Sequence, residues 1–154
     1  EWSNKVQPTF RNFLRVACDR IASAGVGDGG AMATIRLDYE SGAGPDAVHT
    51  RAQSLADTLL TVTGACCVHI GLARTEVSGV KTRETELRPG MAEKEFDMVV
   101  LIEGSGAPEL ETAIPAFEAV IAESGSGVTN PQTIVYNLAY QLTAADMAGT
   151  GAAQ

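Results

Sequence analysis

The order in which two hydrophobic periodicities alternate along the chain constrains its fold more than any other feature. Alternation with a period of two, typical of strands, occurs at residues 32–39, 65–73, 95–103 and 133–142. Apolar residues at helical spacings of three and four follow the first and the third of these segments. The predicted order is therefore strand, helix, strand, strand, helix, strand, which is typical of an α+β fold.

Residues suited to helix ends bound the two predicted helices. The first follows a turn at residues 41–46, and Gly64 ends it in a position suited to a left-handed C-cap. The second begins at Pro108 and Glu109, a proline and an acid in the first turn. Pro115 lies inside the second helix, where its missing N–H predicts a kink.

This order of elements corresponds to the ferredoxin-like βαββαβ arrangement, with both helices on one face of a four-stranded antiparallel sheet. The expected spatial order of the strands is four, one, three, two. The side chains expected to face the helices are Ile35, Leu37, Val68, Ile70, Met98, Val100, Ile134 and Leu138. The side chains expected on the other face are Thr34, Arg36, Asp38, Cys67, His69, Gly71, Asp97, Val99, Leu101, Val135, Asn137 and Ala139.

The second face of the predicted sheet is too apolar to lie open to water. It would carry Val99, Leu101, Val135 and Ala139, a patch of the kind that marks an interface. We expect the sheet to pair face to face with a second copy, as a homodimer, or with a second like unit. The alternative is that an N-terminal helix lies across this face.

The predicted domain organisation has three parts. A helical stripe of apolar residues runs to about Ser23, and the linker that follows, residues 25–30, is rich in glycine. Because a strand rather than a helix follows this linker, it is not a phosphate-binding loop. We therefore expect residues 1–30 to form an N-terminal helix and linker, residues 31–142 the ferredoxin-like unit, and residues 143–154 a flexible tail. Polar residues at 74–94 are expected to form a lid or a solvated excursion.

Charge and cysteine content exclude several classes of protein. The chain has 19 acidic and 11 basic residues, a net charge of -8, and no basic cluster, so nucleic acid and anionic membranes are not expected as partners. No apolar run is long enough to span a membrane and no secretory signal is visible, so a cytoplasmic location is expected. Cys18, Cys66 and Cys67 are odd in number and are expected to be reduced, buried thiols. The spacing of cysteines and histidines predicts neither a metal site nor a cofactor.

The pattern resembles the dimeric α/β-barrel superfamily, in which ferredoxin-like units pair their sheets around a cavity. The residues that carry a narrower resemblance, to bacterial proteins with two such units in tandem, are Pro8-Thr9-Phe10-Arg11-Asn12, Arg15-Val16, and Gly29-Gly30 leading into Met32-Ala33-Thr34-Ile35-Arg36. This resemblance implies that the chain, which begins with Glu1, is the C-terminal unit of a longer protein. The superfamily includes cofactor-free monooxygenases, lactone isomerases and haem enzymes, so the resemblance implies a cavity rather than one activity.

Three side chains of the second sheet face form the predicted site. His69 and Asp97 would transfer a proton, and Arg36 would hold an anionic ligand or a developing enolate. These residues predict a protein that binds or transforms a small, partly apolar molecule by proton transfer without a cofactor. The resemblance implies that such an enzyme would be an isomerase or monooxygenase-like. The alternative is a non-catalytic dimerisation unit in which Arg36 and Asp97 neutralise each other.

Overall fold

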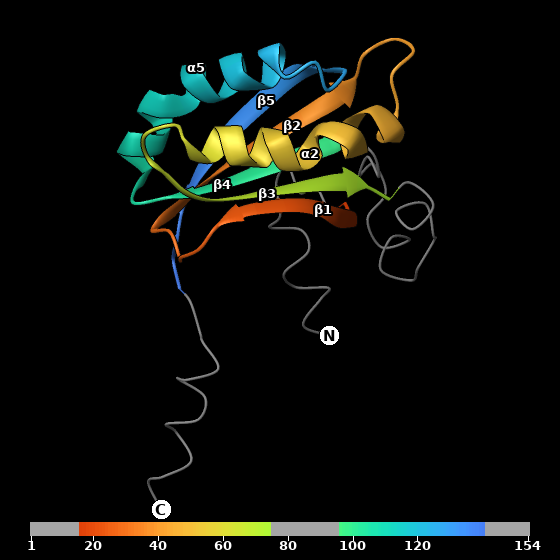
Figure 1. Ribbon diagram of the computed structural model, residues 1–154. Coiled ribbons are helices and arrows are strands. Elements are labelled where there is room, and N and C mark those ends of the chain that lie inside the picture. The colour runs from red at the N-terminus through yellow and green to blue at the C-terminus, as the bar shows by residue number, and fades with distance from the viewer. Residues whose placement is uncertain (1–15, 75–95, 141–154) are drawn as a thin grey trace, which may run out of the picture.

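The computed structural model describes residues 16–74 and 96–140 of the chain. Seven elements follow one another in these two segments (Figure 1). They are β1 (Cys18–Gly25), β2 (Ala31–Tyr39), α2 (Pro45–Leu60), β3 (Ala65–Ala73), β4 (Met98–Gly104), α5 (Ala107–Glu123) and β5 (Val128–Asn137).

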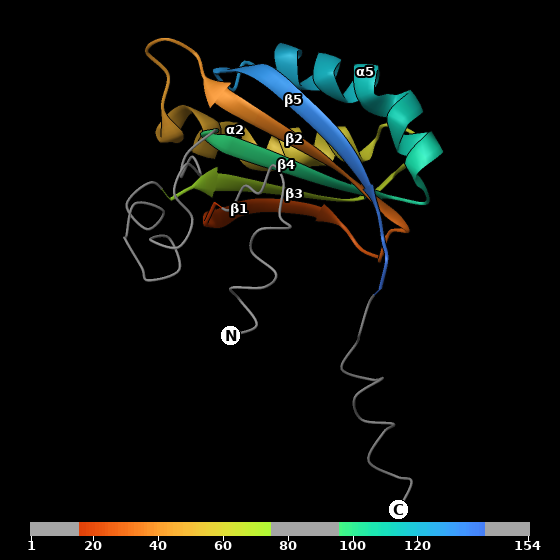
Figure 2. The same ribbon diagram turned by 180° about the vertical axis from the view of Figure 1, so that it is seen from behind.

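The strands form one antiparallel sheet in the order β1-β3-β4-β2-β5. Both helices cover the same face of this sheet, so that the view from behind shows the strands in front of them (Figure 2). The order β5-β2-β4-β3 confirms the predicted order of the four strands. The predicted four-stranded sheet is wrong, because β1 adds a fifth strand beside β3.

Strand β1 replaces the last part of the predicted N-terminal helix. Its inward-facing residues are Ala22 and Ala24, which are buried two positions apart and oppose Ile70 and Val68 of β3. Two alanines are a weak indication of a strand. Ile21 also lies at a helical spacing from the apolar residues before it, so the predicted helix extended through it, although in the structure it lies where the strand pairing shifts register. The sheet therefore begins at Cys18 rather than at residue 31. The remainder of the predicted helix, the tail and most of the polar segment lie outside the described residues.

Strand β5 begins earlier than predicted and presents the opposite face. Thr133 and Val135 oppose Ile35 and Ala33 and share their helix-facing side, whereas Ile134 was predicted to lie there. The prediction that Leu138 faces inward is wrong in the same way, because Leu138 is half exposed. The apolar residues of this segment occur at both parities, so hydrophobicity alone did not select the buried set.

The helices follow their predicted boundaries closely. Both have an early proline at their first turn and an acidic residue nearby, Asp46 in α2 and Glu109 in α5. Helix α5 continues through Pro115, and Gly64 adopts a positive φ of 102° after α2. No helix within the described residues is long and apolar enough to cross a membrane.

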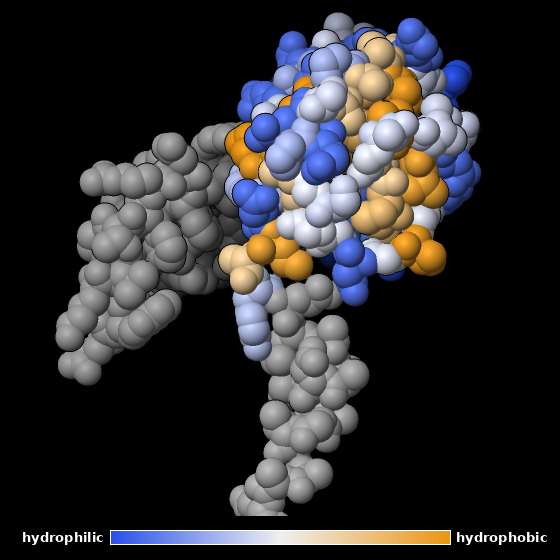
Figure 3. Space-filling model, turned by 90° about the vertical axis from the view of Figure 1, so that its left-hand side faces the viewer, coloured by the Kyte–Doolittle hydropathy of each residue, from blue (hydrophilic) through white to orange (hydrophobic). Residues whose placement is uncertain are grey.

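The core lies between the helices and the sheet. Its fully buried large side chains come from both layers, and the six that were predicted on β2, β3 and β4 are all among them. These six are Ile35, Leu37, Val68, Ile70, Met98 and Val100. Phe117 is the largest contribution of α5 to this core. Outside the core, one side of the molecule shows hydrophobic residues interspersed with hydrophilic ones (Figure 3).

The glycine-rich segment between β1 and β2 crosses the ends of the two strands that separate them. A Cβ atom at Gly29 would come within 2.7 Å of the carbonyl oxygen of Gly104, so only glycine allows the loop backbone to lie this close to the end of β4. The segment is therefore a connection within the sheet, and it brings loop amides beside the last side chains of β4.

Candidate functional site

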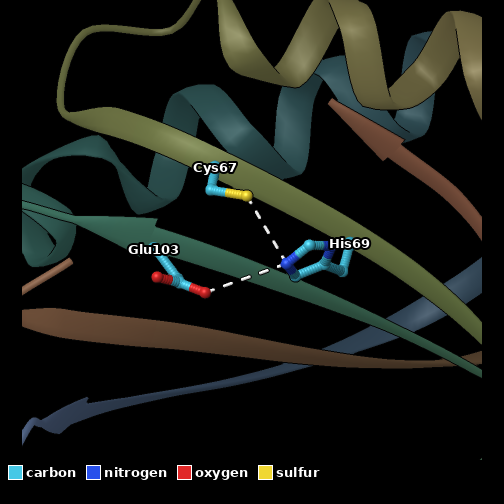
Figure 4. Close-up of side chains that lie close together, drawn as sticks. All are labelled: Cys67, His69 and Glu103. Carbon is cyan, nitrogen blue, oxygen red and sulfur yellow. Dashed lines mark hydrogen bonds and ion pairs between the residues drawn. The ribbon is translucent and has the colours of Figure 1, made fainter. Parts of the chain in front are cut away.

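Three chemically reactive side chains meet on the sheet face opposite the helices, which we call the open face. Cys67 and His69 are two residues apart on β3, so both project from this face. Glu103 of β4 is paired with Cys67 in the strand register, one diagonal step from His69. Figure 4 shows the three side chains converging on one point, and we call them the open-face cluster.

The donor atoms of the cluster are close together. Cys67 Sγ lies 3.4 Å from Nε2 of His69, and the same nitrogen lies 3.8 Å from Oε1 of Glu103 (Figure 4). One ligand atom of each residue lies within 4.8 Å of the others. The thiol, the imidazole and the carboxylate can therefore act on the same bound atom.

Neighbouring groups fix the orientation of two of the three side chains. Nδ1 of His69 lies 2.8 Å from the Ser23 hydroxyl on β1, so the ring's second nitrogen, Nε2, faces the cluster. The Gly29 amide donates a hydrogen bond of 3.0 Å to Oε2 of Glu103, which leaves Oε1 directed at His69. Strand β1 and the glycine-rich loop, both absent from the predicted site, supply these contacts.

The cluster lies at the boundary between interior and solvent. Cys67 is 5% exposed, whereas the side chains of His69 and Glu103 are 27% and 20% exposed. Burial raises the pKa of the Cys67 thiol, and electrostatic repulsion from Glu103 and from Cys66 raises it further. The Val68 amide and Arg20 oppose this rise without reversing it. Cys67 is therefore a neutral thiol near neutral pH and a poor nucleophile.

We expect Cys67 to resist alkylation in the folded protein. Only the thiolate reacts with iodoacetamide. In protein treated with a chelator, Cys67 should therefore react at least about tenfold more slowly in the folded state than in the urea-unfolded state. The difference should narrow as pH rises through the raised pKa, since the folded thiol then ionises. Mass spectrometry of Cys67 peptides after timed labelling measures both rates. Equal rates at neutral pH would contradict the conclusion that Cys67 is a neutral thiol in the folded protein.

The structure does not bring the three predicted site residues, His69, Asp97 and Arg36, together at one place. His69 belongs to the open-face cluster. Asp97 precedes β4, where its carboxylate accepts a hydrogen bond of 2.8 Å from the Tyr39 amide. It lies four residues from Leu101, the partner of His69, so the carboxylate beside His69 is that of Glu103.

Arg36 lies on the open face of β2. Its partners in the register are Val99 on β4 and Gln132 on β5. Asn137, which was predicted on the same face, is opposite Ala31 instead. Arg36 is therefore near the middle of the open face, on a different strand pair from the cluster.

Cys67 and Glu103 were not predicted as site residues, although a signal for the first exists. A spacing of two residues, as in Cys67-Val68-His69, places two ligands on one side of a strand, just as three or four residues do on a helix. The prediction of no metal site rested on the longer spacings alone. Glu103 depends on the register of β3 against β4, which no local pattern determines.

The cluster can perform two kinds of chemistry. A histidine beside a carboxylate can transfer a proton, and a thiol, an imidazole and a carboxylate together can bind a divalent metal ion. Both uses require the lone pair on Nε2 of His69, so they exclude each other at any moment.

The strand order and the helices on one face define a ferredoxin-like α+β unit whose second sheet face is covered by no helix of the described residues. No protein-family model matches the sequence, and no curated protein does. A search of solved structures finds a dimeric ferredoxin-like protein of unknown function from Thermobifida fusca YX. The similarity has a TM-score of 0.43 at 14% identity, over 73% of this chain and 95% of that one.

Proposed function

We propose that the protein is a self-associating ferredoxin-like unit whose open face pairs with the open face of a second copy, as in a dimeric α/β barrel. One observation carries the proposal. Ile134, Tyr136 and Leu138, which we call the apolar strip, are 41%, 54% and 50% exposed. These are larger than Thr133 and Val135, the residues of the same segment that face α5 and the core.

The apolar strip is continuous with other apolar side chains of the open face. Ile134 opposes Thr34 of β2, and Tyr136 opposes Met32. Leu101 extends the same face across β4, where Val99 is already buried in the single chain. Residues of this kind, gathered on one sheet face, are typical of a surface that is covered by a partner.

The distribution of charge favours the open face over the helical layer as the surface for association. Two copies with a net charge of -8 each repel one another in general. In the two helices the acidic residues outnumber Arg51, the basic residue of this layer, by six to one. Within the described strands, the charged side chains that the pairing places on the open face are Arg20, Arg36, Asp38 and Glu103, two of each sign. Face-to-face pairing therefore brings together the less repulsive surfaces.

The mass of the protein in solution tests the proposal. Light scattering across micromolar concentrations should give twice the 16.0 kDa mass of the chain. A monomer at every concentration would contradict self-association and would favour a segment of the same chain as the cover. In a longer chain with two such units in tandem, the same face would pair within the chain.

Binding of a small, partly apolar molecule between the paired sheets is a second candidate function. It is favoured by the position of the open-face cluster, a few convergent polar groups beside an apolar surface. In cofactor-free proton transfer, His69 would be the base and Glu103 its carboxylate partner. A thermal-shift screen of small carbonyl compounds tests this function. At least one compound should raise the melting temperature of the protein, and His69→Gln should abolish that increase.

A further inference from the structure

The open-face cluster combines the three kinds of side chain that bind zinc in proteins. Thiolate sulfur, imidazole nitrogen and carboxylate oxygen are its usual ligands. Cys67, His69 and Glu103 offer one of each within 4.8 Å, and the ligands come from two adjacent, hydrogen-bonded strands. A sheet is a rigid support, so the ligands are held in place by the backbone pairing.

The distances within the cluster agree with those around a tetrahedral zinc ion. Zinc bonds of about 2.3 Å to sulfur and about 2.05 Å to nitrogen, at a tetrahedral angle, place the two donor atoms about 3.6 Å apart. The structure has 3.4 Å between Sγ of Cys67 and Nε2 of His69. The nitrogen and oxygen donors should be about 3.4 Å apart, and the structure has 3.8 Å. These two distances need shifts of a few tenths of an ångström, and the sulfur and oxygen donors, which lie within 4.8 Å of each other, must come to about 3.6 Å.

Two of the three ligands already have the outer hydrogen bonds that zinc ligands require. The Ser23 hydroxyl can accept a hydrogen bond from Nδ1–H of His69, which selects the tautomer with a free lone pair on Nε2. The Gly29 amide binds one oxygen of Glu103 and leaves the other for the metal. Such partners orient the ligands before the ion arrives.

We propose that Cys67, His69 and Glu103 form a Zn²⁺ site whose fourth position is left for water or another ligand. Binding converts the Cys67 thiol to a thiolate, and its proton goes to the solvent. The thiol's weak contact with the Gly25 carbonyl oxygen, at 3.9 Å, is lost in the process. The partial exposure of His69 and Glu103 gives the ion a path from solvent.

The zinc site is independent of self-association, because all three ligands belong to one chain. In the sheet-paired dimer it would lie between the two sheets. A bound ion would occupy Nε2 of His69, so zinc binding and proton transfer by His69 are alternative states of the cluster.

Titration of the metal-free full chain with Zn²⁺ and Co²⁺ tests the site. One ion per chain should bind, and Co²⁺ should produce a sulfur-to-cobalt charge-transfer band together with intense visible bands typical of tetrahedral coordination. Each of Cys67→Ser, His69→Gln and Glu103→Gln should weaken Zn²⁺ binding at least about 100-fold, since even second-shell changes cost 10–100-fold. Ser23→Ala should weaken it about tenfold.

Cys66→Ser is the matched control, because it removes the adjacent thiol and leaves the cluster intact. This variant should retain full affinity and the charge-transfer band. Circular dichroism of every metal-free variant separates loss of a ligand from loss of the fold. The site would be disproved by a stoichiometry far below one, by cobalt spectra without the sulfur band, or by affinity that survives Cys67→Ser combined with His69→Gln.

Discussion

Replacing Tyr136 with glutamate is expected to convert the proposed dimer into monomers. Tyr136 lies in the middle of the apolar strip and is 54% exposed in the single chain. In a twofold-symmetric pair each substitution occurs twice, so two carboxylates would be buried in an apolar interface. An unpaired buried charge costs several kcal/mol. The dissociation constant should therefore rise at least about 100-fold, which corresponds to about 2.8 kcal/mol.

Ala116→Glu provides the matched control for this variant. Ala116 is exposed on α5, in the helical layer, and the substitution adds the same charge there. Sedimentation velocity at several concentrations should show a dimer for Ala116→Glu and a monomer for Tyr136→Glu, with the same circular dichroism for both. If both variants stay dimeric, the dimer uses a surface other than the open face.

The part of the fold that the sequence predicted is the part with strong local periodicity. Strand β4 carries large apolar residues and helix α5 has a clear start, so the order of β5, β2, β4 and β3 followed from general rules. Strand β1 did not follow, because Ala22 and Ala24 are small and their burial depends on α2 and β3 above and beside them.

The facing of β5 shows a second limit of local patterns. This strand carries apolar residues on both sides, and a register shift between Arg36 and Asp38 changes its pairing with β2. The structure places the larger set, which includes Ile134 and Tyr136, away from the helices. Val135, predicted for the open face, therefore lies on the helix side, and Ile134, predicted for the core, lies on the open face.

The sequence predicted one of the three residues of the open-face cluster, His69. His69 followed from its place on the second sheet face, which needs only the parity of β3. The identity of the carboxylate required the register between β3 and β4, and a choice between Asp97 and Glu103 could not be made without it. Ser23 could not be found at all, because the segment that contains it was predicted as a helix.

Replacing Phe117 with alanine is expected to cause the largest loss of stability. Phe117 is 0% exposed and is the largest fully buried side chain in the core, where it fixes α5 against the sheet. Removing a buried phenylalanine leaves a cavity as well as losing apolar contact, so the free energy of unfolding should fall by about 3–5 kcal/mol. Urea denaturation measures this loss. If the slope of the unfolding free energy against urea concentration is the same as in the unmodified protein, the folded state stays compact.

Ala116→Gly, at the neighbouring exposed position, separates core packing from helix propensity. It should cost about 1 kcal/mol, because glycine weakens a helix without touching the core. Both variants must be compared at one protein concentration, since dissociation of a dimer contributes to unfolding.

Helix α5 also packs against β5, the strand that bears the apolar strip, and the Thr133 hydroxyl of β5 donates a hydrogen bond of 2.7 Å to Glu118 of α5. A loss for Phe117→Ala no greater than that for Ala116→Gly would mean that α5 does not hold β5 in place, and the strip would then lack the rigid support that self-association requires.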